Sequence, residues 1–198
     1  MDIAIATPQP DTTSNPTAGW RQGTDLWVFA YGSLMWNPDF DHVEARTARL
    51  AGYHRAMCIL SYQWRGTPER PGLVMGLDRG GSCRGRVFRV AAPQVPAAME
   101  HIYRREMPTG VYVPRFVPVT LDDGRRVEAW AFIARHGHPQ YVAHSSPERS
   151  AALIRQGHGK AGSCRDYLAN TIVQLEMLGL GGAGLKRLLA LVDDLTPS

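Results

Sequence analysis

The order of local patterns along the chain limits the fold more than any other feature of the sequence. Up to Ala134, short apolar runs alternate with turn residues, which is typical of β-strands. After Ser145, apolar residues recur every three or four positions, which is typical of amphipathic helices. Strands first and helices last predict an α+β fold, with a twisted or barrel-like sheet covered by helices.

Turn residues separate the expected strands. Asp122-Asp123-Gly124 is a strong hairpin signal, and Asp78-Arg79-Gly80-Gly81 is expected to form a second turn. Pro114 and Pro118 indicate that their strand lies at an edge or carries a bulge, because proline has no N–H for the ladder. The strands are expected at Leu26–Tyr31, Leu50–Ser61, Leu73–Leu77, Gly85–Ala91, Val111–Leu121 and Arg126–Ala134.

One helix is expected among the strands, over Gln94–Met107, with Pro108 ending it. Four of its residues are spaced four, three and four positions apart, so they share one face of the helix. Three of the four are apolar and the last is a carboxylate. The four residues are Val95, Met99, Ile102 and Glu106.

The later helices carry start and stop signals. Ser145-x-x-Glu148 predicts a capping box at the first of them, and Ser163-x-x-Asp166 predicts a cap for the second. Gly179 is expected to end the second helix, because glycine readily adopts the left-handed conformation found after a helix C-terminus. A last amphipathic helix is expected over Leu185–Leu195.

Length and composition favour one domain preceded by an arm, and the length also leaves room for two small domains. A chain of 198 residues that is 44% hydrophobic buries one substantial core. Residues 7–23 are rich in proline, threonine, serine and glycine, so they offer little apolar surface for burial. We therefore expect a flexible arm over residues 1–24 and a single domain over residues 25–198.

Charge and cysteine content exclude several classes of partner. The net charge is +4, and no basic run interleaved with aromatics indicates nucleic acid. No apolar run reaches the about 20 residues of a membrane span, and the first residues do not resemble a secretory signal. The three cysteines form no C-x-x-C pair, so we expect reduced thiols in a cytoplasmic protein and no zinc site. Four histidines match no common metal-ligand spacing, so we expect them to lie at the surface. They are His136, His138, His144 and His158.

Cys164 lies in the expected first turn of a helix, where a thiol pKa can be lowered. No partner for it follows from the sequence, so a structural role is the better interpretation.

Glu106 is the candidate proton carrier of the chain. It stands on the apolar stripe of its helix and at the helix C-terminus. Burial and the helix dipole both disfavour its charged form there, so both raise its pKa. Arg104 or Arg105 would oppose that rise. The competing interpretation is a solvated glutamate at a frayed helix end.

The segment Tyr31-Gly32-Ser33-Leu34-Met35-Trp36 places a glycine bend directly after a strand. Backbone N–H groups in such a bend can hold an anion without a charged side chain. Ser33 is an alternative nucleophile, but the G-x-S-x-G pattern is absent. The polar loop Arg65–Gly72 is expected to fold over the same site, with Arg65 offering its guanidinium to a carboxylate.

Four segments of the chain form a specific ordered set of motifs: Val28–Pro38, Arg65–Gly72, Tyr103–Glu106 and Gly162–Leu168. Taken in this order, they resemble the ChaC-type γ-glutamylcyclotransferases. They are similar to the two signature segments of that family, to the segment bearing its catalytic glutamate, and to its C-terminal element. After the glutamate, this chain has Met107–Tyr112 where many members have Lys-Gly-Gly-Tyr.

The resemblance implies a small mixed β-barrel with flanking helices and cleavage of glutathione to 5-oxoproline and Cys-Gly. It implies Glu106 as the general acid and base, and neither a metal nor an organic cofactor. Two alternatives remain open: a cyclotransferase for other γ-glutamyl amines or dipeptides, and a γ-glutamyl-binding module without catalysis. The expected substrate-binding residues are Tyr31, Gly32, Ser33, Leu34, Arg65, Tyr112 and Tyr141.

Overall fold

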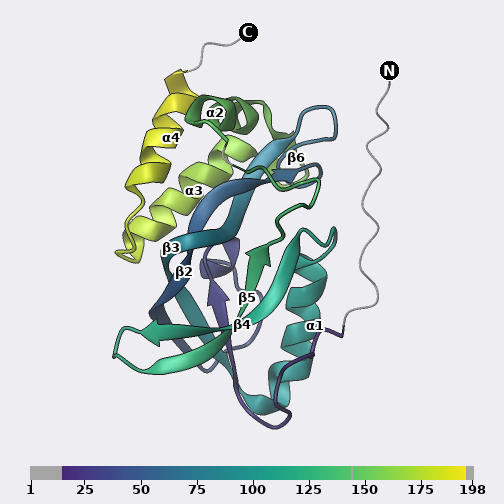
Figure 1. The fold of residues 1–198 in the computed structure, drawn as a ribbon, viewed down its shortest axis with the longest axis vertical. Coiled ribbons are helices and arrows are strands. Elements are labelled where there is room, and N and C mark those ends of the chain that lie inside the picture. Colours follow the sequence, from purple (N-terminus) through teal and green to yellow (C-terminus); the bar gives the residue numbers. More distant parts are fainter. Residues whose placement is uncertain (1–14, 144, 195–198) are drawn as a thin grey trace. The chain divides into compact units, whose positions relative to one another are not determined.

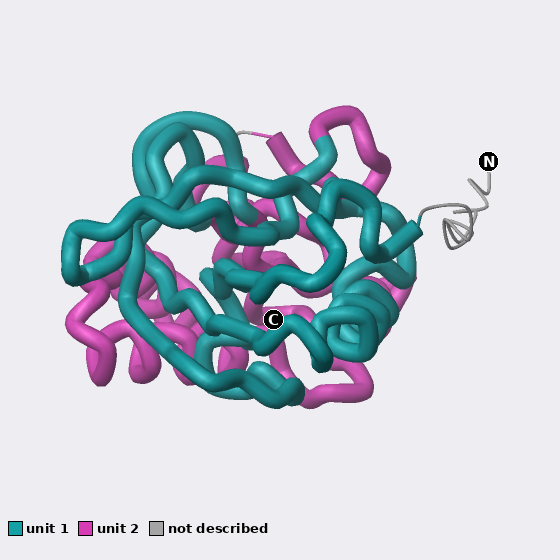
Figure 2. Tube along the Cα trace, turned by 90° about the horizontal axis from the view of Figure 1, so that it is seen from below, with its two compact units in different colours: residues 1–55, 77–135 teal, residues 56–76, 136–198 magenta. Residues whose placement is uncertain are grey.

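The computed structural model describes residues 15–143 and 145–194. The chain divides into two compact units, coloured separately in Figure 2. The first unit comprises residues 1–55 and 77–135, and the second comprises residues 56–76 and 136–198. The first 14 residues of the expected arm lie outside the described residues, and residues 15–24 form turns. The division into an arm and one domain stays a prediction.

The sheet closes into a barrel in the order β1-β3-β2-β4-β5 (Figure 1). Strand β1 pairs antiparallel with β3 and parallel with β5, so the barrel is mixed, as expected. Large aromatic side chains fill the core of the first unit, among them Phe29, Phe88 and Trp130. The strands are β1 (Leu26–Ala30), β2 (Glu44–Ser61), β3 (Gly72–Val90), β4 (Tyr112–Leu121) and β5 (Arg126–Ala134).

Two strands differ from the sequence prediction. Strand β2 begins at Glu44, six residues before the predicted start, and β3 runs without interruption over Gly72–Val90. The predicted turn at Asp78–Gly81 is therefore wrong. Gly80 and Gly81 have φ angles of 93° and 67°, so the strand bends through a conformation that glycine tolerates and then continues.

The β4–β5 hairpin is confirmed around Asp122–Gly124. Its two prolines lie opposite Phe132 and Glu128 of β5. On its other side, β4 pairs with β2 over Val119–Leu121, beyond both prolines. The prolines are thus placed where a missing N–H removes no bond of the β2–β4 ladder.

The first unit also contains α1 (Val95–Glu106), which follows the 3₁₀ turn η2 (Ala92–Gln94). Val95, Met99 and Ile102 are fully buried, which confirms the apolar face that their spacing predicts. The helix ends with Met107 as its C-cap, next to Pro108.

The second unit contains the remaining helices. α2 begins at Pro147, and Ser146 rather than Ser145 is its N-cap, because proline fits the first helical position and the residue before it caps. Ser163 caps the next helix through Asp166 N–H at 3.0 Å, as predicted, and Gly179 follows its end with a φ angle of 62°. The elements are α2 (Pro147–Gln156), β6 (His158–Gly159), β7 (Gly162–Ser163), α3 (Cys164–Met177) and α4 (Ala183–Asp194).

Glu44, at the start of β2, predicts how the barrel responds to acid. Hydrogen bonds from Arg89, Arg46 and Arg125 lower the pKa of Glu44 from 4.5 to about 2. A carboxyl whose pKa is lower in the folded state stabilises above its unfolded pKa, and that stability is lost as the pH falls toward 2. Replacing Glu44 with Gln should therefore lower the melting temperature at pH 7, and the difference should vanish near pH 2. Melting temperatures of both proteins across this range test it, and a difference independent of pH would contradict it.

Candidate active site

The loop after β1 presents backbone N–H groups that have no acceptor. Residues Ser33–Met35 form the 3₁₀ turn η1, and Gly32 precedes it. Gly32 O accepts from Met35 N, and Ser33 O accepts from Asn37 N. In the described part of the chain, the N–H groups of Gly32, Ser33 and Leu34 donate to no protein acceptor. Successive unpaired N–H groups of this kind suit a carboxylate.

Three arginines from three different elements hold the carbonyl groups of this loop. Arg55 of β2 donates from Nε to Tyr31 O at 2.5 Å, and Arg86 of β3 donates from Nη1 to Met35 O at 3.2 Å. Arg105 of α1 donates from Nη1 to Asn37 O at 2.7 Å. The carbonyls are thereby occupied, and the loop conformation is held independently of any ligand.

Glu106 is the last residue of α1, and its side chain is only 18% exposed. Burial raises its pKa above the usual value, and the Arg105 guanidinium, with Nε 3.3 Å from Glu106 Oε1, opposes the rise. A carboxyl group with a raised pKa exchanges protons more readily with an amine than an ordinary glutamate does. Of the two arginines that the sequence offered as neighbours, Arg105 is the one in contact, whereas Arg104 pairs with Glu100.

Helix α1 contacts the segment between Ser33 and Asp39 through two of its side chains. His101 Nε2 lies 3.1 Å from Asp39 Oδ2, and one turn later Arg105 Nη2 donates to Ser33 Oγ at 3.0 Å. Arg105 therefore contacts both the loop and Glu106. Ser33 Oγ accepts from a guanidinium, and no base contacts it among the described residues, which argues against Ser33 as the nucleophile.

Three of the other predicted binding residues also belong to the first unit. The Tyr31 hydroxyl donates to Phe132 O of β5 at 2.8 Å, so it anchors the start of the loop to the barrel. Leu34 is buried, so its side chain packs inside the protein. Tyr112 opens β4 opposite Ala134 and is buried.

Arg65 and Tyr141 belong to the second unit. The Arg65 guanidinium donates from Nη1 to Ala161 O and to Ser163 O, and it lies over the Tyr167 ring at 5.3 Å. Tyr141 forms a β-bridge with Ile59 and stacks on the His136 ring at 4.5 Å. Within its own unit, Arg65 thus joins the polar loop to the segment before α3. Their roles toward substrate stay predictions.

The sequence analysis missed Arg55 and Arg86. Each lies within a strand, and each reaches a backbone carbonyl of the 31–37 loop. Both strands contain other arginines, so a charged residue inside a strand did not distinguish these two. Their targets are 24 and 51 residues away in the chain, so no local pattern indicated them.

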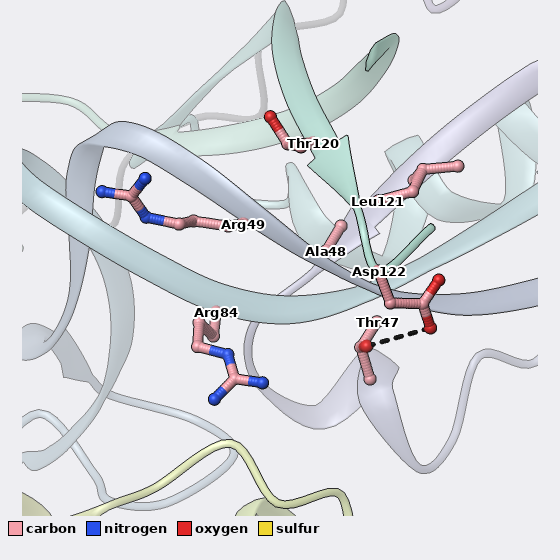
Figure 3. Close-up of a pocket in the computed structure, with 7 residues that line it drawn as sticks. All are labelled: Thr47, Ala48, Arg49, Arg84, Thr120, Leu121 and Asp122. Atoms are coloured by element: carbon pink, nitrogen blue, oxygen red, sulfur yellow. Dashed lines mark hydrogen bonds between the residues drawn. The ribbon is translucent and has the colours of Figure 1, made fainter. Parts of the chain in front are cut away.

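A pocket of about 280 Å³ lies elsewhere in the first unit (Figure 3). The long side chains of Arg49 and Arg84 extend on one side of it, and the hydrogen bond from Thr47 to Asp122 lies on the other. None of the predicted site residues lines it. The lining residues are Thr47, Ala48, Arg49, Arg84, Thr120, Leu121 and Asp122.

No described helix combines the length and the apolar character that spanning a membrane requires. No group of three or more histidine, cysteine or acidic side chains within residues 15–143 and 145–194 is arranged to hold a metal ion.

Cys164 is a packed structural thiol. Its Sγ donates to Leu73 O at 2.8 Å and accepts from Leu73 N at 3.3 Å, and burial raises its pKa to about 11. The pKa of Cys83 is also raised by burial. Because the thiolate is the reactive form, we expect neither thiol to be alkylated by iodoacetamide at pH 8 in the native protein. Mass spectrometry of native and urea-unfolded samples tests this, and rapid native labelling would contradict it.

Comparison with known proteins gives consistent matches. A model of the ChaC-like protein family matches residues 26–195. The glutathione-specific gamma-glutamylcyclotransferase of Escherichia coli is 37% identical over 86% of this chain and 74% of its own length. The glutathione-specific gamma-glutamylcyclotransferase 1 of Rattus norvegicus is 30% identical over 89% of this chain and 83% of its own. A solved glutathione-specific gamma-glutamylcyclotransferase from yeast matches 86% of this chain and 96% of its own with a TM-score of 0.78 at 21% identity, which concerns the fold alone.

Proposed function

Because this chain belongs to the ChaC-like protein family, we propose that it is a γ-glutamylcyclotransferase that cleaves glutathione to 5-oxoproline and Cys-Gly. The observation that carries the proposal beyond the family is one arrangement in the first unit. A buried carboxyl group, Glu106, and a loop with unpaired amides, Gly32–Leu34, are joined by the side chain of Arg105. A proton carrier and an anion-binding loop are what this reaction needs.

The chemistry is an internal attack. The α-amine of the γ-glutamyl group attacks its own side-chain carbonyl carbon, a C–N bond forms and closes the five-membered ring, and the bond to the cysteinyl nitrogen breaks. The nucleophile is tethered to its target, so the enzyme has only to hold the productive conformer. The amine must lose a proton, and the leaving amine must gain one, so one carboxyl group serves both steps.

Glu106 suits this double transfer because of where it lies. An ordinary glutamate with a pKa of about 4.3 differs by about 4 units from an α-ammonium, which makes proton transfer uphill by about 5 kcal/mol. Burial raises the pKa of Glu106 and narrows that difference. In the proposed mechanism, Glu106 takes the proton from the substrate ammonium and returns it to the nitrogen of Cys-Gly.

The loop supplies the binding half of the site. We assign the N–H groups of Gly32, Ser33 and Leu34 to the substrate α-carboxylate, since they are the donors without protein acceptors. The carbonyl groups of Tyr31, Met35 and Asn37 in the same loop accept hydrogen bonds from arginines, so the loop need not reorganise when the substrate arrives. A preformed set of donors is what makes backbone amides effective in binding and in stabilising developing charge.

The thiols support a cytoplasmic location. All three cysteines are buried without a disulfide, which fits the reducing cytoplasm where we place the reaction.

Product analysis with a substrate panel tests the proposed function. Purified protein is incubated with glutathione and, in parallel, with γ-glutamyl dipeptides, and 5-oxoproline is quantified by mass spectrometry. We expect 5-oxoproline and Cys-Gly in equal amounts from glutathione and much less product from the dipeptides. Preference for a dipeptide would indicate a cyclotransferase of different specificity. Binding of glutathione by calorimetry without any product would indicate a binding module.

A further inference from the structure

Arg105 is the described side chain that contacts both halves of the proposed site. We propose that Arg105 is a positioning residue, which holds the carboxylate of Glu106 in a defined place relative to the amides of Gly32–Leu34. This inference rests on the proposed function and adds to it a residue that binds neither substrate nor product.

The guanidinium of Arg105 divides its donors among three groups. Nη1 donates to Asn37 O at 2.7 Å, Nη2 donates to Ser33 Oγ at 3.0 Å, and Nε lies 3.3 Å from Glu106 Oε1. The side chain is 23% exposed, so these contacts are largely protected from water. A planar fork with five N–H donors holds three acceptors at once, and a lysine ammonium with one flexible nitrogen holds fewer in a fixed geometry.

The three contacts have a direct catalytic consequence. Two of them determine where the loop lies relative to the C-terminus of α1, and the third orients the carboxylate that α1 carries. Loss of the guanidinium would release both the loop and the Glu106 carboxylate from these contacts. A misplacement of about 1 Å in a reacting group costs about 10²-fold in rate.

Arg105 also controls the protonation state of Glu106. Burial raises the pKa of that carboxyl, and the adjacent guanidinium limits the rise. A base must be ionised to accept the substrate proton, and without Arg105 the pKa of Glu106 would rise further, so a given degree of ionisation would be reached only at a higher pH.

Other charged side chains near the loop contact groups other than the Glu106 carboxylate. Arg55 and Arg86 contact the carbonyls of Tyr31 and Met35, and His101 pairs with Asp39. On the helix itself, Arg104 is 73% exposed and pairs with Glu100. Within residues 15–143 and 145–194, Arg105 is therefore the charged side chain in contact with the Glu106 carboxylate.

The test compares the pH dependence of kcat/KM for Arg105→Met, Arg105→Lys and a matched control, Arg104→Met. For Arg105→Met we expect kcat to fall about 10²-fold and the acidic limb of the profile to move to higher pH. Arg105→Lys keeps the charge, so its acidic limb should stay near that of the wild type while kcat remains reduced. Arg104→Met removes a charge from the same helix and should change neither kcat nor the position of the acidic limb.

The outcomes separate this inference from the proposed function. The positioning role alone would be overturned if the wild-type protein is active and Arg105→Met has the same kcat and the same pH profile as the wild type. A wild-type protein that releases no 5-oxoproline would overturn the proposed function and this inference with it. A fall in kcat without any shift of the acidic limb would reduce Arg105 to a structural residue and also overturns the proposal.

Circular dichroism melts show whether each variant folds. If Arg105→Met does not fold, Arg105→Lys is combined with Ser33→Ala, which removes one acceptor of the guanidinium. The loss in kcat from Arg105→Lys should be smaller in the Ser33→Ala background, because the two changes remove the same contact. Fully additive losses would contradict the proposal.

Discussion

Replacing Glu106 with Gln is expected to lower kcat for glutathione by about 10²- to 10⁴-fold, the usual contribution of a positioned acid or base. Glutamine keeps the shape and polarity of the side chain and loses its ability to carry a proton. The substrate carboxylate is held by the loop in the proposed mechanism, so KM should change far less than kcat. The measurement is the rate of 5-oxoproline release at saturating and limiting glutathione.

The same variant should fold at least as stably as the wild type. The pKa of Glu106 is raised by burial, so at pH values between its unfolded and folded pKa the native state holds a proton that the unfolded chain releases. The free energy of unfolding therefore falls as the pH rises from the pKa of Glu106 in the unfolded chain through its pKa in the folded protein. Glutamine does not titrate, so the stability of the variant relative to the wild type should increase over that range.

Glu100→Gln is the matched control. Glu100 lies on the same helix, is 65% exposed and contacts Arg104 at 3.8 Å. The same chemical change at this position should leave kcat and KM unaltered. Substantial turnover by Glu106→Gln, or an equal loss in Glu100→Gln, would remove Glu106 from the mechanism.

Replacing Gly72 with Ala should strongly destabilise the second unit. A Cβ at Gly72 would overlap Arg65 O and approach Cys164 Cβ at 3.3 Å. A Cβ at Gly157 would lie 2.5 Å from both Arg65 O and Gly72 Cα. These backbones are also tied together, since Gly157 O accepts from Cys164 N at 2.9 Å. Main-chain atoms cannot move aside as a flexible side chain does, so the clash can be removed only by shifting the backbone, which destabilises the fold.

We expect Gly72→Ala and Gly157→Ala each to destabilise by about 3 kcal/mol or more, at the upper end of overpacking substitutions. For a protein of this size, that corresponds to a fall in melting temperature of roughly 6–12 °C. Thermal melts followed by circular dichroism measure it.

Gly184→Ala is the contrasting control in the same unit. Gly184 lies in the first turn of α4, and a Cβ there would meet no atom within 4 Å. Alanine favours a helix over glycine by about 0.5–1 kcal/mol, so this variant should be slightly more stable than the wild type. If Gly72→Ala melted like Gly184→Ala, close packing of the backbones at Gly72 would be excluded.

Local patterns predicted the elements well where one physical rule acted alone. The continuous apolar run at β1, the spacing along α1, and the cap at Ser163 each depend on residues within a few positions of one another. The predictions failed where two local rules competed. Gly80-Gly81 was interpreted as a turn, although the same left-handed conformation also lets a long strand bend and continue. Ser145 was chosen as a cap, although Pro147 makes Ser146 the capping residue.

The amino-acid order alone was enough to indicate the α+β class, the helical face that carries Glu106, and the glycine bend at residues 31–34, because periodicity and turn chemistry act over a few residues. The contacts that hold the 31–37 loop and the Glu106 carboxylate join residues far apart in the chain, so they could be seen only in the tertiary structure. Arg105 meets Ser33 across 72 residues of chain, and Tyr31 meets Phe132 across 101. Which of two neighbouring arginines faces the carboxylate, and which carbonyls hold the loop, depends on how the strands close into a barrel. No spacing within a segment encodes that closure.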